Sequence, residues 1–305
     1  MWRALRSRYA GRHRPEPRDL HVRAARHLLA PGRALAGIVE RLGRGTLGWC
    51  RTVSYLVAVV TSALALACRR AHWSSAVWDV FARQLLFTGV DAIWLSVRVA
   101  VAVGIMVVVQ AELWLATFGQ MELIGQLLLT VLVRELAPLL ANLVVIVRSG
   151  TAITTELATM RLAGEIDVLD AQGLDPMTYL VMPRVLSMPI AVFGLTAVFT
   201  VVSFASGYLV GAAMGSIVGG PGLFFSGILE AVSWEDAMFF FPKTIVSGLF
   251  VAAICATEGL SVGAAVTEVP QAAGRATTRS LSAVLVVSAV LSLIIYGRFL
   301  VIKVL

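Results

Sequence analysis

Histidine is scarce in this 305-residue sequence and is confined to its beginning. The only four histidines are His13, His21, His27 and His72, all ahead of the first long apolar run. The HExxH zinc-protease motif and Ser-His hydrolase chemistry both need histidine beside the reacting groups. Neither chemistry is therefore expected in the apolar part of the chain.

Lysine and cysteine are also rare. Neither of the two lysines, Lys243 and Lys303, follows glycine as in the phosphate-binding loop of an ATPase. The three cysteines, Cys50, Cys68 and Cys255, are odd in number and fit neither a disulfide framework nor CxxC metal spacing. We therefore expect a chain that is not an enzyme and holds no metal or cofactor of its own.

Charged residues make up only 14% of the sequence, whereas 58% are hydrophobic and the mean hydropathy is +0.86. This composition does not suit a water-soluble surface and indicates a polytopic membrane protein. A membrane-spanning helix needs roughly 20 mostly apolar residues. The fold expected is all-α, with five spans near Ala92–Leu115, Ile124–Val147, Leu186–Met214, Met238–Val262 and Leu281–Leu300.

A shorter apolar run, Val53–Ala67, lies between Arg51 and the pair Arg69-Arg70. It is too short to span, and spanning would leave one basic flank on the far side of the membrane. The pattern predicts an interfacial or re-entrant helix.

The positive charge is concentrated at the N-terminus. Met1–Arg51 carries twelve arginines and three acidic residues (net +9), and the remainder has thirteen basic and fifteen acidic residues (net −2). A basic tail joined to membrane spans indicates a cytoplasmic N-terminus and contact with anionic lipid rather than nucleic acid. We expect residues 1–45 to form a poorly ordered leader. An organellar transit peptide is the alternative, which the scarcity of serine and the prolines Pro15 and Pro17 disfavour.

The second span contains two adjacent charges and a proline, in VLVRELAPLL, Val131–Leu140. Adjacent helical residues point about 100° apart, so Arg134 and Glu135 cannot pair well with each other. Each needs a partner outside its own helix, a water-filled cavity or a lipid headgroup. Pro138 has no N–H for the Arg134 carbonyl one turn back, so the helix is expected to bend there. Two interpretations stay open: a substrate-facing wall, or a pair that braces the helices.

A long polar interruption, Arg148–Arg184, separates the second and third spans. Within it, residues 165–170 predict a short amphipathic helix, Gly173 offers a C-cap, and Asp175-Pro176 opens the next element. A short cytoplasmic helix fixed between two spans suits contact with a soluble partner. At the outer end of the first span, Gln110 and Glu112 are candidates to line an exit.

The run RELAPLLANLVVIVRSGTAITTELATMRLAGEIDVLDAQGLDPMTYLVMPRVL, Arg134–Leu186, resembles the signature region of the MlaE/YrbE permease family. GRATTRSL, Gly274–Leu281, is a second match in the correct order. The resemblance runs from about Gly43 to Lys303 and gives a permease domain over residues 46–305. It implies a lipid-moving ABC transporter subunit in the bacterial inner membrane, working with a second copy of itself, a separate ATPase that binds ATP and Mg, and a periplasmic Mce-domain protein.

The resemblance also implies roles for individual residues. Arg134 and Glu135 match a pair beside the lipid cavity. Gln110 is a further candidate substrate contact from its position near the outer end of the first span, not from the resemblance. Val53–Ala67 matches the family's interfacial elbow helix. The residues that match the ATPase-coupling helix and the turn after it are Glu165, Asp167, Leu169, Gly173, Asp175 and Pro176.

Glu258 departs from the family, which often has lysine or a neutral polar residue nearby. We expect it to anchor the fourth span at the interface, with Glu268, Arg275 and Arg279 in the loop that follows, Glu268–Arg279. The alternative function is a self-contained channel or ion-coupled transporter that uses Arg134, Glu135 and Glu258 as a polar relay. Such transporters usually show paired, broken helices in two halves, and no internal repeat is visible in the sequence.

Overall fold

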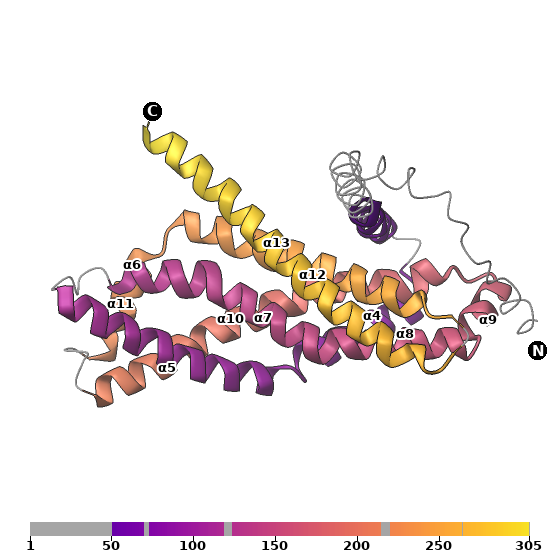
Figure 1. The fold of residues 1–305 in the computed structure, drawn as a ribbon, viewed down its shortest axis with the longest axis horizontal. Helices are drawn as coiled ribbons and strands as arrows, with labels where there is room; N and C mark the ends of the chain where they lie inside the picture. The colour runs from indigo at the N-terminus through magenta and orange to yellow at the C-terminus, as the bar shows by residue number, and fades with distance from the viewer. Residues whose placement is uncertain (1–50, 70–72, 119–123, 215–219, 264, 305) are drawn as a thin grey trace, which may run out of the picture. The chain divides into compact units, whose positions relative to one another are not determined.

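The computed structural model describes residues 51–69, 73–118, 124–214, 220–263 and 265–304 (Figure 1). Every regular element within these ranges is helical, which confirms the all-α prediction. The chain divides into two units, Met1–Tyr55 and Leu56–Leu305. The predicted leader, residues 1–45, lies outside the described residues, so the domain boundary at residue 46 stays a prediction.

Five helices are long and apolar enough to cross a membrane, as predicted: Ser75–Leu115, Gln126–Leu162, Met177–Ala213, Trp234–Leu260 and Glu268–Gly297. They are built from α4 (Ser75–Gly89), α5 (Ile93–Phe118), α6 (Ile124–Leu128), η4 (Leu129–Leu136), α7 (Ala137–Val145), η5 (Ile146–Gly150), α8 (Thr151–Leu162), η6 (Met177–Val181), α10 (Met182–Ala213), α12 (Trp234–Leu260) and α13 (Glu268–Val304). Two shorter helices, α9 (Glu165–Ala171) and α11 (Pro221–Ala231), connect them.

The short N-terminal helix is present as Arg51–Ala67 and is too short to span, as predicted. Its interfacial placement stays a prediction. The helix α4 after it was not predicted, because Asp79 and Arg83 interrupt its apolar pattern. Ser74 caps its start by accepting a hydrogen bond from the Val77 backbone N–H.

Close approach of backbones holds α10 against its neighbours. A Cβ on Gly104 of α5 would lie 2.2 Å from the Ser203 carbonyl oxygen, and one on Gly248 of α12 would lie 2.7 Å from Pro189 Cα. Only glycine allows these contacts, which is how small residues bring membrane helices together. In Figure 1, α5, α7 and α10 all extend lengthwise across the view and are inclined to one another.

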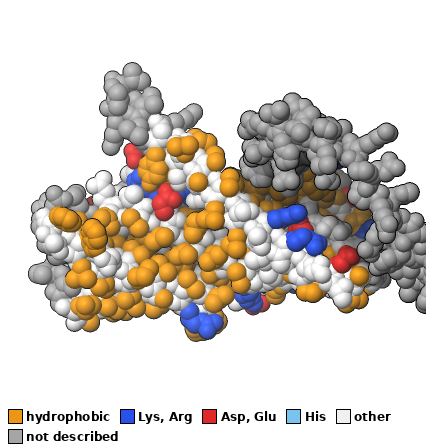
Figure 2. Space-filling view, viewed as in Figure 1, with side chains coloured by type: hydrophobic (Ala, Val, Ile, Leu, Met, Phe, Trp, Pro, Cys, Tyr) orange, Lys and Arg blue, Asp and Glu red, His pale blue; other side chains and the backbone are white. Residues whose placement is uncertain are grey.

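Large apolar side chains lie on the outside of the helices. Trp94, Val201 and Leu293 are 77%, 67% and 76% exposed. Figure 2 shows hydrophobic side chains across most of one face, over α5 and α7, with charged side chains in a few small groups. Such a surface suits hydrocarbon rather than water.

One expectation about the connections was wrong. The segment Glu268–Arg279 was expected to be a loop, but it forms the first three turns of α13. Its charges are compatible with a helix because they have partners. Glu268 accepts the Gly263 backbone N–H at 2.6 Å, and Arg275 and Arg279 both contact Glu258.

Candidate functional site

The charged pair of the second span lies in a π-helical segment, η4, that ends just before Pro138. In this wider turn the Ala137 N–H donates to the Leu132 carbonyl, five residues back. As predicted, Pro138 leaves the Arg134 carbonyl without its usual helical donor. Lys243 of α12 supplies the missing hydrogen bond, with its Nζ 2.8 Å from that oxygen.

Arg134 contacts the start of α12. Its Nε lies 2.6 Å from Asp236 Oδ1, and its NH2 lies 3.9 Å from Glu235 Oε2. The guanidinium carbon is 5.1 Å from the centre of the Phe239 ring. Asp236 is itself fixed, because its other oxygen accepts the Ser233 backbone N–H at 2.7 Å in the capping box of α12. The arginine therefore meets a carboxylate whose position the helix start already determines.

Glu135 points to two other helices. Its Oε2 lies 2.7 Å from Lys243 Nζ, and its Oε1 accepts a hydrogen bond from the Ser292 hydroxyl of α13 at 3.0 Å. The Lys243 side chain is 1% exposed, whereas that of Glu135 is 38% exposed. Arg134 and Glu135 thus each have a partner on another helix, as helix geometry required. Because Glu135 stays accessible, the pairing leaves both the bracing and the substrate-facing interpretations possible.

Sequence reasoning did not find Lys243, Asp236 and Ser292, which complete this cluster with Arg134 and Glu135. We call these five residues, together with Glu235 beside Arg134, the η4 network. Lys243 offered a usable signal, since it is one of two lysines in the chain and lies inside an apolar span. Charged residues in spans are functional candidates by default.

Gln110 and Glu112 lie on α5, outside the η4 network. Gln110 is exposed, and among the described residues no hydrogen bond or ion pair joins it to Arg134 or Glu135. Its role in substrate binding stays a prediction. Glu112 is 1% exposed, and neither carboxylate oxygen has a hydrogen-bond partner in the described part of the chain.

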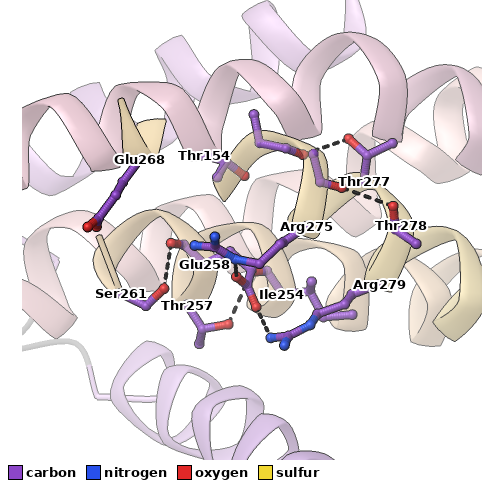
Figure 3. Close-up of polar contacts among 12 residues, drawn as sticks. Thr154, Ile254, Thr257, Glu258, Ser261, Glu268, Arg275, Thr277, Thr278 and Arg279 are labelled. Atoms are coloured by element: carbon purple, nitrogen blue, oxygen red, sulfur yellow. Dashed lines mark hydrogen bonds and ion pairs between the residues drawn. The ribbon is translucent and has the colours of Figure 1, made fainter. Parts of the chain in front are cut away.

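A second charged cluster surrounds Glu258 near the end of α12 (Figure 3). Its Oε2 lies 3.1 Å from Arg275 Nε, and its Oε1 contacts Arg279 NH1. The Glu258 side chain is 7% exposed, so the carboxylate is buried and paired with α13. Its anchoring of the fourth span at the interface stays a prediction. The two arginines come from GRATTRSL, one helical turn apart. We call Glu258, Arg275 and Arg279 the Glu258 clamp.

The predicted amphipathic helix is α9, Glu165–Ala171. Ile166 is buried and Leu169 packs against the same apolar cluster, whereas Glu165, Asp167 and Asp170 are exposed. Gly164, with φ of 73°, allows the chain to turn between α8 and α9. A short helix with one apolar side packed and an acidic side exposed is thus present, and Asp167 Oδ1 of that side lies 3.2 Å from Arg161 NH1. Its coupling role stays a prediction.

The turn after α9 has the predicted capping chemistry. Gly173 has φ of 77°, its N–H donates to the Asp170 carbonyl, and the Leu174 N–H donates to the Leu169 carbonyl, which together form a Schellman motif. Asp175 then accepts hydrogen bonds from the backbone N–H groups of Met177 and Thr178, at 3.2 and 3.1 Å. Pro176 follows it at the start of the next helical segment, where a missing N–H costs nothing.

Residues 81–294, from α4 to α13, match the family described as Permease MlaE. The match includes the η4 network, α9 and the Glu258 clamp. The chain belongs to the MlaE permease family.

Similar proteins of the MlaE family come from distant organisms. A probable ABC transporter permease protein of Synechocystis is 27% identical over 70% of this chain and 80% of its own length. The intermembrane phospholipid transport system permease protein MlaE of Haemophilus influenzae is 26% identical over 72% of this chain and 84% of its own. The chloroplastic protein TRIGALACTOSYLDIACYLGLYCEROL 1 of Arabidopsis thaliana is 27% identical over 72% of this chain and 61% of its own.

Proposed function

We propose that this chain is the membrane subunit of an ABC transporter that moves phospholipid or a related lipid. The name of the Haemophilus relative supports the substrate class, and the Synechocystis relative's name supports the transporter class. A separate ATPase binds ATP and Mg and drives the movement. The complex lies in the bacterial inner membrane, with the N-terminus and α9 on the cytoplasmic side and α11 on the outer side.

The observation that carries this proposal is the η4 network inside apolar spans. Two basic and three acidic side chains, Arg134 and Lys243 with Glu135, Glu235 and Asp236, meet there, and Glu135 and Glu235 are 38% and 42% exposed. A charged group deep in a span costs about 2.5 to 3.5 kcal/mol on insertion scales, so its retention favours a functional role. Accessible carboxylates beside a bent helix suit the passage of a polar headgroup.

Membership of the MlaE permease family supports the partners that we propose. We propose that two copies of the chain form the lipid path between them, and that a periplasmic Mce-domain protein receives or delivers the lipid at the outer end. Lipid-facing side chains such as Val131, 38% exposed on η4, border this path.

The acidic side of α9 is the proposed contact for the ATPase. The experiment is to purify the chain and ask whether an ATPase subunit accompanies it. Glu165→Lys and Asp167→Lys should each abolish that association, because both reverse an exposed charge without touching the buried Ile166. Glu230→Lys is the matched control, since Glu230 is an exposed carboxylate on α11 at the other end of the bundle. Association that survives in both α9 variants would overturn the coupling assignment.

No contact favours the alternative of a self-contained transporter. A relay through Arg134, Glu135 and Glu258 needs these groups to be connected. The η4 network contacts α12 at Lys243 and the Glu258 clamp at Glu258, and these two positions are fifteen residues, about 22 Å, apart along the helix. Among the described residues no polar contact bridges them. Each cluster is instead paired within itself.

A further inference from the structure

Glu112 on α5 is an unpaired carboxylate in a place where charge is costly. Its side chain is 1% exposed, and neither oxygen has a hydrogen-bond partner among the described residues. Burial of an ionised carboxylate without compensation costs several kcal/mol or more. Such a group either holds a proton or meets a cation at some stage of the protein's work.

Comparison with the other buried charges makes Glu112 exceptional. In the part of the chain that the structure describes, four further charged residues are buried: Arg184, Asp236, Lys243 and Glu258. All four have a counter-charge within 4 Å, on Glu156, Arg134, Glu135 and the arginines of the Glu258 clamp, respectively. The fold thus pairs its buried charges as a rule, and only Glu112 in this set lacks a partner of its own.

The packing of α5 on α10 shows where Glu112 lies. A Cβ on Gly104 would meet Ser203, and a Cβ on Gly207 would lie 2.6 Å from Val108 Cβ, so the two helices run parallel with residues 104 and 108 beside 203 and 207. One helical turn further along, the same spacing places Glu112 at the level of Gly211, which is buried. Glycine has no side chain to neutralise the carboxylate. The space beside Glu112 is therefore free of any fixed counter-ion from this part of α10.

Aromatic rings border this region. Val108 and Ala111, beside Glu112 on α5, pack in one apolar cluster with Phe224 of α11, and Tyr208 of α10 packs against it. The ring centres of Tyr208 and Phe224 are 5.2 Å apart, and those of Phe224 and Phe225 are 5.4 Å apart. The apolar cluster that Ala111, the neighbour of Glu112, belongs to thus contains aromatic rings. A carboxylate and aromatic rings together bind ammonium groups, by charge and by cation–π attraction.

The η4 network adds to the negative electrostatic potential at this end of the spans. Its acidic partners exceed its basic ones, since Glu135, Glu235 and Asp236 face Arg134 and Lys243, three against two. Glu112 adds a further negative charge at the same end of the bundle. This end of the spans therefore favours a headgroup that carries a positive charge over one that is only anionic.

We propose that Glu112 receives the ammonium group of a zwitterionic phospholipid as the headgroup passes the outer ends of α5 and α10. This inference rests on the proposed function and gives its substrate class. In the present structure the carboxylate is enclosed, so the outer ends of α5, α10 and α11 must separate to admit the headgroup. The close helix contacts at Gly104 and Gly207 lie on the inner side of Glu112 and can remain.

The test measures which lipid the protein retains. The full chain, with the ATPase subunit that copurifies with it, is placed in nanodiscs of equal dioleoyl phosphatidylethanolamine and phosphatidylglycerol, and retained lipids are counted by native mass spectrometry. The wild type should retain phosphatidylethanolamine preferentially. Glu112→Gln, which keeps shape but not charge, should reduce that preference by about fivefold to tenfold, the size of one charge-assisted contact. Glu112→Asp should keep part of it.

Glu230→Gln is the control, since it removes an exposed carboxylate on α11 and should leave the preference unchanged. If Glu112→Gln fully keeps the preference for phosphatidylethanolamine, the inference is overturned. Glu112 would then be a protonated, neutral group, which the amide of glutamine replaces well. Lipid retained by the wild type without any class preference would also overturn it. If the wild type retains no lipid above the nanodisc background, the proposed function itself fails.

Discussion

The η4 network and the Glu258 clamp both pair charged side chains from different helices, but the buried partner is the base in one and the acid in the other. In the network the cation is buried and the acid accessible: the Lys243 side chain is 1% exposed and that of Glu135 is 38% exposed. In the clamp the acid is buried and the cations accessible: Glu258 is 7% exposed, and Arg275 and Arg279 are 42% and 57% exposed. The two clusters therefore expose charge of opposite sign.

This difference agrees with the proposed orientation. Accessible arginines suit the cytoplasmic interface, where anionic headgroups and the positive-inside rule favour basic residues. Accessible carboxylates at the other end suit the outer side and a headgroup with a positive group. The comparison also predicts different costs when each cluster is broken, because a buried group left without a partner is penalised more than an exposed one.

The largest effect is expected for Lys243→Met. This change removes the counter-charge of Glu135 and the donor to the Arg134 carbonyl in one step. We expect a loss of about 3 kcal/mol in stability, because two groups lose their partner at once: the Arg134 carbonyl, and Glu135, which is 38% exposed and so partly hydrated. The thermal stability of the detergent-solubilised protein is the measurement. The double variant Lys243→Met/Glu135→Gln should recover part of the loss, and a double variant no more stable than the single one would argue against the pairing.

A smaller effect is expected for Glu258→Gln. The arginines left behind are partly exposed and can be hydrated, so we expect a loss of about 1 to 3 kcal/mol, the range for a buried hydrogen-bonded group. The same thermal measurement applies. A loss as large as that of Lys243→Met would show that the burial pattern does not set the cost.

The smallest effect is expected for Arg279→Ala. Arg275 continues to pair with Glu258, and an exposed ion pair contributes about 1 kcal/mol or less. Raising the salt concentration should reduce the difference between variant and wild type, because exposed pairs are screened. The effect of Lys243→Met should change little with salt, and equal salt sensitivity in both variants would contradict the assigned burial.

The sequence predicted those features that depend on local chemistry. Five spans followed from apolar length, and Gly173 as a C-cap and Asp175 as the start of the next element followed from their capping preferences. Helix geometry also required separate partners for Arg134 and Glu135, and Pro138 indicated a free carbonyl. Each of these conclusions needs only residues within one or two helical turns.

The partners themselves could not be predicted in this way. Lys243 lies 109 residues from Arg134, and Ser292 lies 157 residues from Glu135, so only the packing of α12 and α13 brings them together. The helical start of α13 was missed for the same reason. Arg275 and Arg279 looked like loop charges until Glu258, on another helix, was seen to neutralise them.

The central claim is that η4 borders a lipid path in a permease driven by a separate ATPase. A photoreactive amino acid in place of Val131, the exposed residue of η4 one turn before Arg134 and Glu135, tests it by crosslinking to lipid in membranes. The account predicts that Arg134→Ala and Glu135→Gln each lower lipid crosslinking while the ATPase still copurifies. Unchanged crosslinking in both variants, with lower expression of the protein, would contradict it and leave the pair as a brace between helices.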